Sequence, residues 1–339
     1  MGWTVRLSLV IAAWALAGAC AAAGYKPPRT SDGRPDLEGV WDSATLTPVQ
    51  RPPEFKSLVV PEADAVAYER RMNDPQALDA DFHKRFPNAP DVGAVQTEWD
   101  YTAHNRLARI GGQARGAILI DPPDGQLPIR PDVRPALRER RLRDLRTFDA
   151  AEDRPLGERC LLIGGPPLLS GDTIQIVQTR DHVVLSLEYD HMVRIVRLSD
   201  HRPTPTAVTP WMGDSTGWWE GDTLVVETTR FNPGHLHWVL GARMPISPSA
   251  RVTERFSRTS GGEILYRFTV DDPAIYARPW SGVLPLTATR KRQFEYACHE
   301  GNYALPGILA GARLAEREGR TPEPLDGGDP PPKPAAATP

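Results

Sequence analysis

The feature that most constrains the fold of this chain is a series of eight short segments with strand-like composition between residues 172 and 297. Each is rich in β-branched and aromatic residues, and they cover 174–179, 183–189, 192–198, 224–229, 252–257, 264–270, 283–289 and 293–297. Tight turns such as 220–222 and 260–262 join several of them, and short connections require antiparallel neighbours. The sequence therefore predicts a mainly β fold, an antiparallel meander that forms a barrel-like or strongly curled sheet.

The alternation of side chains within these segments defines two faces for each strand. In 183–189, Leu185 and Leu187 lie on one side, and Ser186 and Glu188 lie on the other. Polar faces turned inward would give the barrel a hydrophilic pocket. Polar faces turned outward would simply be solvated, which is the commoner arrangement.

A few helices and two proline-rich segments complete the predicted organisation. Helices are expected near 61–74, 131–148 and 307–318, within a single β-rich domain that covers 61–320. A proline-rich segment at 25–60 precedes this domain, and a disordered tail at 321–339 follows it. Proline contributes 35 of the 339 residues, and such a share argues against a helical bundle or a coiled coil.

Residues 1–24 have the pattern of an export signal. Arg6 precedes an apolar run at 7–16, and small residues follow it. Cleavage before Cys20 would leave a lipid-modified cysteine, although Ala17 stands where a lipobox normally has Leu. Ordinary signal cleavage within 19–23 is the alternative. Either outcome predicts an extracytoplasmic protein, which is in the periplasm or, if Cys20 is lipid-modified, anchored to the envelope membrane through that residue.

The other two cysteines are Cys160 and Cys298. Cysteines that reach an oxidising compartment tend to pair. We therefore expect a disulfide that ties the middle of the chain to its end, with two separate buried thiols as the alternative.

Residues 213–217 match the G-x-S-x-G pattern of a serine nucleophile, which makes Ser215 a candidate catalytic residue. A nucleophile elbow requires a strand before the serine and a helix after it. Here Pro210 precedes the motif and a predicted hairpin follows it, so a glycine-flanked loop is the better interpretation.

Three charged residues are further catalytic candidates. Asp214 lies among tryptophans, and partial desolvation of its carboxyl group would suit general acid catalysis. Glu188 could supply a second carboxylate for glycosidase-like chemistry, and Arg194 could stabilise developing charge. The alternative for Glu188 is a cross-strand ion pair with Arg194 or Arg197.

The aromatic residues of the predicted sheet could line a binding pocket for a small amphipathic or carbohydrate ligand. Its walls would be Trp211, Trp218, Trp219, Trp238 and Tyr266.

A polar cluster follows Cys298 directly. If the disulfide forms, His299 and Glu300 are held rigidly, as candidate catalytic and ligand-binding residues respectively. The alternative is that these side chains form a hydrogen-bonded network whose role is only structural.

Metal, cofactor and nucleic-acid signals are weak. His235 and His237 are candidate metal ligands, but zinc usually takes three or four ligands, so surface histidines are the alternative. No phosphate-binding glycine loop or dinucleotide fingerprint is present, so no cofactor is predicted. The net charge of −3 argues against a nucleic-acid partner. The arginine-rich helix at 131–148 predicts a solvated face or a contact with an anionic envelope surface.

Three blocks carry a resemblance: DGRPDLEGVW at 32–41, WMGDSTGWWEGDTLVV at 211–226 and ACHEGNY at 297–303. They resemble blocks shared by a large set of exported bacterial proteins of no settled activity. The resemblance implies export and a β-rich domain, and it implies no catalytic residues. Gly39-Val40-Trp41 also resembles the Gly-x-Trp opening of calycin or lipocalin-like barrels.

These features together predict an exported protein that binds a small ligand in an aromatic-lined pocket. An extracytoplasmic enzyme of hydrolase or lyase type, acting on such a ligand through carboxylate acid–base chemistry, is the alternative. An envelope interaction protein is the second alternative.

Overall fold

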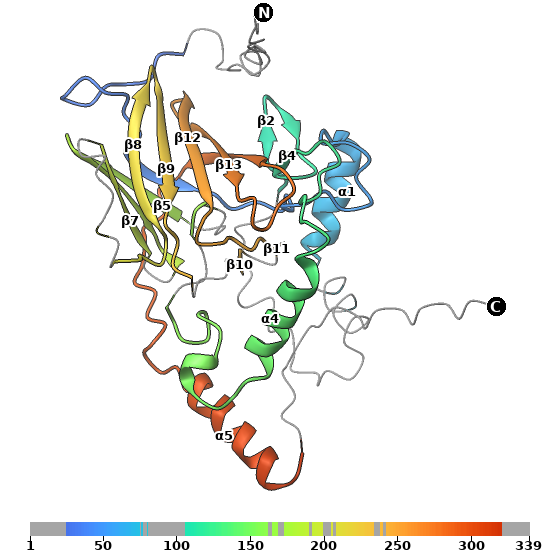
Figure 1. Ribbon diagram of the computed structural model, residues 1–339. Coiled ribbons are helices and arrows are strands. Elements are labelled where there is room, and N and C mark those ends of the chain that lie inside the picture. The colour runs from blue at the N-terminus through green and yellow to red at the C-terminus, as the bar shows by residue number, and fades with distance from the viewer. Residues whose placement is uncertain are drawn as a thin grey trace, which may run out of the picture.

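The computed structural model describes residues 25–74, 76, 80, 106–161, 165–168, 173–189, 192–198, 205, 208–233, 238–239 and 242–320. Within these residues nine strands close into a barrel, which confirms the predicted mainly β, calycin-type fold (Figure 1). Their order around the barrel is β1 (Gly39–Asp42), β5 (Thr173–Gln178), β6 (His182–Leu187), β7 (Val193–Arg197), β8 (Asp214–Glu220), β9 (Thr223–Thr229), β12 (Arg251–Ser260), β13 (Glu263–Asp271) and β14 (Trp280–Ala288). The barrel closes where β14 pairs with β1. The short strand β4 (Leu119–Asp121) also pairs with β14.

An odd number of strands cannot alternate in direction all the way around a closed barrel, so one neighbouring pair must be parallel. That pair is β7 and β8, which are joined by a single residue pair, Arg197 and Thr216. The other neighbouring strands of the described barrel are antiparallel. The predicted antiparallel meander is therefore interrupted at this junction. Parallel neighbours need a longer connection than a tight hairpin turn, and residues 198–213 separate Arg197, the end of β7, from Asp214, the start of β8, whereas the tight turn at 220–222 joins the antiparallel pair β8 and β9.

Seven of the eight predicted segments are strands of the barrel, namely β5, β6, β7, β9, β12, β13 and β14. The eighth prediction, at 293–297, is wrong, because these residues form no strand. The side chain of Gln293 bonds to the sheet instead, and its Nε2 donates to the backbone carbonyls of Thr173 and Ser186. The prediction of a glycine-flanked loop at 213–217 is also wrong, since most of this segment belongs to the strand β8.

Three described helices accompany the barrel: α1 (Glu62–Met72), α4 (Arg134–Arg146) and α5 (Ala304–Arg317), each close to its predicted bounds. In Figure 1, α4 and α5 lie beyond one end of the barrel, and α1 lies beside the hairpin of β2 (Arg109–Ile110) and β3 (Gln113–Ala114). A second small hairpin consists of β10 (Trp238–Val239) and β11 (Ala242–Arg243). Among the described helices, none has the length and apolar character needed to cross a membrane.

Apolar side chains from alternate strand positions line the barrel interior. On β6 the apolar face, including Leu185 and Leu187, is buried, and Ser186 on the other face is partly exposed. The polar face of this strand therefore points outward. Large aromatic side chains occupy the other wall, where successive ring centroids lie 4.9 to 5.6 Å apart in the series Phe256, Tyr266, Phe268 and Trp280.

The packing on this wall predicts a strong effect at Gly282 of β14. A Cβ atom at this position would lie 2.2 Å from Cζ of Phe268. We expect Gly282→Ala to lower the free energy of unfolding by about 3 kcal/mol, the upper end of typical overpacking, as measured by urea denaturation. Gly261→Ala is the matched control, because a Cβ atom at Gly261 meets no atom within 4 Å. Equal losses of unfolding free energy in both variants would contradict the close packing of Gly282 against Phe268.

Candidate functional site

Charged and hydroxyl side chains interrupt the apolar lining on five neighbouring strands. The inward-facing residues Arg194 (β7), Ser215 (β8), Thr228 (β9), Glu254 (β12) and Tyr266 (β13) are each at most 3% exposed. We call these five residues the polar belt. Because their strands are neighbours in the sheet, the polar belt occupies one wall of the barrel.

Three members of the polar belt and one backbone amide form a connected group. Nη2 of Arg194 lies 2.7 Å from Oε2 of Glu254. The hydroxyl of Tyr266 donates to Oε1 of Glu254 over 2.7 Å and accepts a 2.8 Å hydrogen bond from the backbone N–H of Leu168. Tyr266 is thus satisfied as both donor and acceptor. A buried ion pair lies directly beside it.

The ion pair itself is incompletely hydrogen-bonded. Nε, Nη1 and Nη2 of Arg194 are buried, and so is Oε2 of Glu254, yet none has a hydrogen-bond partner among the described residues. The 2.7 Å approach of Nη2 to Oε2 is therefore an ion contact without hydrogen-bond geometry. Buried groups in this condition are rare in folded proteins, because each costs about 1–3 kcal/mol. The Arg194–Glu254 pair is consequently where the described interior can best accept polar atoms from a ligand.

The other two members of the polar belt satisfy each other. The hydroxyl groups of Ser215 and Thr228 are 2.8 Å apart and hydrogen-bonded. Ser215 lies within the strand β8 and not at a strand-to-helix turn, so the structural context of a nucleophile elbow is missing.

Asp214 lies on the outer side of the barrel at the parallel junction. Its Oδ1 is 2.7 Å from Nη1 of Arg197, and its Oδ2 is 3.9 Å from Nη1 of Arg230. The Asp214–Arg197 ion pair therefore connects β8 to β7 where only one residue pair joins the two strands.

The predicted ion pair of Glu188 with Arg194 or Arg197 is wrong. Arg194 faces inward and contacts Glu254, and Arg197 contacts Asp214. Glu188, just beyond the end of β6, instead accepts a 2.8 Å hydrogen bond from the hydroxyl of Thr173.

The predicted aromatic wall is divided between the two sides of the barrel. Tyr266 faces inward, and so does Trp219, whose buried indole N–H has no hydrogen-bond partner among the described residues. Trp218 is exposed, with its indole N–H donating to Glu220 over 2.9 Å, and Trp211 is exposed as well. The side chain of Trp238 lies outside the described residues.

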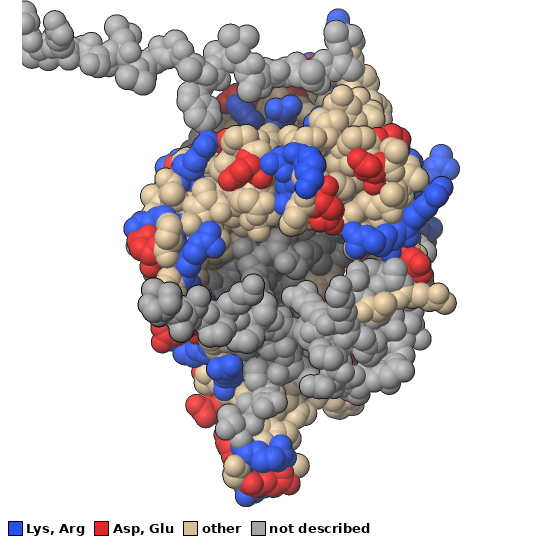
Figure 2. All heavy atoms as spheres, turned by 90° about the vertical axis from the view of Figure 1, so that its right-hand side faces the viewer, with Lys and Arg blue, Asp and Glu red and all other residues tan. Residues whose placement is uncertain are grey.

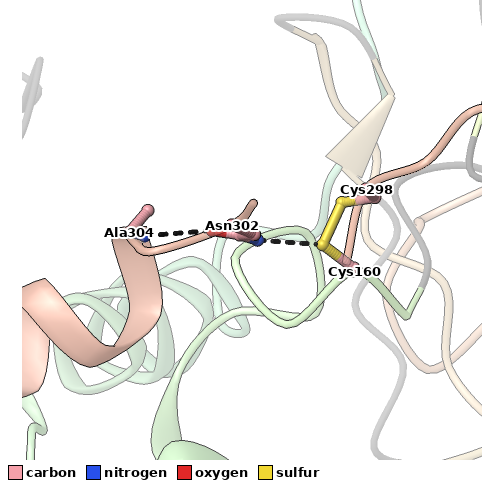
Figure 3. The surroundings of a disulfide bond; sticks show 4 residues. All are labelled: Cys160, Cys298, Asn302 and Ala304. Carbon is pink, nitrogen blue, oxygen red and sulfur yellow. Dashed lines mark hydrogen bonds between the residues drawn. A yellow bond between two sulfur atoms is a disulfide. The ribbon is translucent and has the colours of Figure 1, made fainter. Parts of the chain in front are cut away.

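The predicted disulfide between Cys160 and Cys298 is confirmed. It lies next to the start of α5, where Asn302 links the two elements (Figure 3). Nδ2 of Asn302 donates to Sγ of Cys160 over 3.0 Å, and its Oδ1 accepts a 3.1 Å bond from the backbone N–H of Ala304. His299 and Glu300, the predicted polar cluster, are exposed at this position.

The predicted metal ligands His235 and His237, like Cys20, lie outside the described residues. Within the described ranges, no group of three or more His, Cys, Asp or Glu side chains is placed to hold a metal ion.

Lys and Arg side chains are interspersed with Asp and Glu over the described part of the face in Figure 2. The described arginine side chains of α4 are mostly exposed.

Comparison with protein-family models, curated proteins and solved structures finds no match. The polar belt is therefore the feature from which a function can be argued.

Two of its members, Glu254 and Thr228, are absent from the predicted site residues. In each case the available signal was a polar residue at an alternate, otherwise apolar position, as Glu254 is between Val252 and Phe256.

Buried tyrosines predict a loss of stability in alkali. Burial raises the pKa of Tyr266 well above its usual 10, and the charge of Glu254 adds to this; burial also raises the pKa of Tyr276. Above pH 10 the unfolded chain releases these protons and the folded chain keeps them. The free energy of unfolding should therefore fall by about 1.4 kcal/mol per pH unit for each tyrosine.

Urea denaturation between about pH 9 and pH 11 measures this slope, with tyrosinate absorbance as the second readout. Tyr266→Phe should remove one tyrosine's share of the slope, whereas Tyr303→Phe, at an exposed position, should leave the slope unchanged. An unchanged slope in Tyr266→Phe would contradict the assignment.

Proposed function

We propose that this protein binds a small amphipathic or carbohydrate ligand inside its barrel. The observation that carries the proposal is Arg194, a guanidinium group at the wall of the barrel that is 3% exposed and has buried N–H groups without hydrogen-bond partners among the described residues. A ligand that accepts hydrogen bonds would satisfy these groups.

The surroundings of Arg194 and Glu254 support this proposal. Sites for small molecules are mostly apolar and aromatic, with a few placed polar groups that orient the ligand. The barrel interior has this composition, because aromatic rings line the wall beside Tyr266 and the polar belt supplies the few polar groups. An exposed arginine would have water as its partner and would give no such indication.

The same proposal places the protein outside the cytoplasm, in the periplasm or anchored to the envelope through Cys20. The disulfide between Cys160 and Cys298 supports an oxidising compartment. The export-signal pattern of residues 1–24 supports export of the chain to such a compartment.

Native mass spectrometry of the protein purified from its own cell envelope tests the binding function. We expect an organic molecule to copurify with the wild-type chain. The double variant Arg194→Met/Glu254→Gln should lose it, and Glu220→Gln, which alters an exposed carboxylate on the outside of β8, should retain it. Near-ultraviolet circular dichroism shows that each variant is folded. A bare polypeptide mass for the wild-type protein would contradict the proposed function.

A further inference from the structure

We infer that the ligand is a neutral amphiphile that places a hydroxyl group beside the Arg194–Glu254 ion pair, within hydrogen-bond reach of both side chains. This inference rests on the proposed function and specifies the chemical class of its ligand. Its basis is the complementarity of buried atoms that have no hydrogen-bond partner among the described residues, since Nε and Nη1 of Arg194 can only donate and Oε2 of Glu254 can only accept.

A hydroxyl group matches both of these requirements at once. Its oxygen accepts from the guanidinium group of Arg194, and its hydrogen donates to Oε2 of Glu254. A carboxylate or phosphate could accept from Arg194 but has no hydrogen to offer Glu254 when ionised. It would therefore leave Oε2 without a hydrogen-bond donor and would bring a second negative charge towards it.

The charge balance of the site also favours a neutral ligand. Arg194 and Glu254 are the buried charged side chains on the inward faces of the described barrel strands, and their Nη2 and Oε2 atoms lie 2.7 Å apart with side-chain exposures of 3% and 0%. Their charges compensate each other, and burial keeps the hydroxyl of Tyr266 protonated by raising its pKa. An anionic ligand would add an uncompensated charge to this buried group, which is strongly unfavourable in an apolar interior.

The neighbouring rings explain why the ligand should also have an apolar part. The ring of Tyr266 lies 4.9 Å from that of Phe256 and 5.6 Å from that of Phe268. The remaining hydroxyl groups of the polar belt, Ser215 and Thr228, are already bonded to each other. The described wall thus offers the Arg194–Glu254 pair as its charged attachment point, on a surface that is otherwise aromatic and apolar apart from the unpartnered indole N–H groups of Trp219 and Trp280.

The test compares two probes with the same alkyl chain, octyl glucoside and octanoate, both below their micellar concentrations. Binding to the full-length wild-type protein is measured by calorimetry and by tryptophan fluorescence. We expect octyl glucoside to bind at least about tenfold more tightly than octanoate. Equal or tighter binding of octanoate would overturn the inference and leave the proposed binding function standing.

Binding of neither probe would also overturn the inference. The proposed function would fail with it only if native mass spectrometry showed a bare polypeptide, so the two failures are distinguishable.

A variant tests the charge argument directly. Glu254→Gln keeps an oxygen that can accept from Tyr266 but leaves the charge of Arg194 uncompensated. We expect its preference to shift towards octanoate by about tenfold or more, whereas Glu220→Gln should keep the wild-type preference. An unchanged preference in a folded Glu254→Gln variant would count against the inference. If that variant does not fold, the wild-type comparison of the two probes still decides the matter.

Discussion

Arg194→Met should lower the free energy of unfolding by about 3–5 kcal/mol, the cost of leaving one member of a buried ion pair without the other. The carboxylate of Glu254 would then remain fully buried, with the hydroxyl of Tyr266 as its one described hydrogen-bond donor. Glu254→Gln should have a comparable effect, because it leaves the guanidinium group of Arg194 charged and buried. Urea denaturation at neutral pH measures both losses.

The double variant Arg194→Met/Glu254→Gln should recover much of the lost stability. Both buried charges are absent from it, and the new amide side chain at position 254 can still accept a hydrogen bond from Tyr266 through its oxygen. The double-mutant cycle should therefore give a coupling free energy of about 2–4 kcal/mol. Arg255 and Glu220 form the matched control, since this ion pair lies on the outside of the barrel with side chains 40% and 47% exposed. Its coupling should be at most about 1 kcal/mol. Additive losses at Arg194 and Glu254 would contradict the ion pair.

Loss of the disulfide should have the second large effect. The cysteines are separated by 138 positions, and a cross-link over so long a loop restricts the unfolded chain strongly. We expect Cys160→Ser/Cys298→Ser to lower the free energy of unfolding by about 4 kcal/mol. Denaturation with and without dithiothreitol measures this, because the reductant should destabilise the wild-type protein and leave the double variant unchanged. Equal stability of oxidised and reduced wild-type protein would contradict a stabilising role.

The strands that could be predicted from the sequence are those with regular alternation and β-branched residues. The strand β8 shows both signals only weakly, because it begins with Asp214 and Ser215, contains Gly217 and has a single β-branched residue, Thr216. Its conformation depends on pairing with β9, where Gly217 lies opposite Val226. A Cβ atom at Gly217 would lie 2.8 Å from Cγ1 of Val196, so the glycine is required by interior packing and not by a turn.

The candidate site was predictable only in part. Arg194 and Tyr266 are polar residues in recognisable strands, and Ser215 is marked by its G-x-S-x-G motif; each is a predicted site residue that lies in the polar belt. The contact of Arg194 with Glu254 could not be predicted, because β7 and β12 are separated by β8 and β9 in the sheet. Local alternation defines which residues share a face. It does not define which residues of distant strands meet across the interior.

The disulfide has one more consequence, which concerns proteolysis. Eight of the nine barrel strands, from Thr173 in β5 to Ala288 in β14, lie between Cys160 and Cys298 in the chain, and β1 alone precedes them. A protease that cuts one peptide bond in this interval produces two fragments that stay covalently joined. Both halves of a nicked barrel thus remain at high effective concentration with respect to each other, so a single cleavage need not separate Arg194 from Glu254.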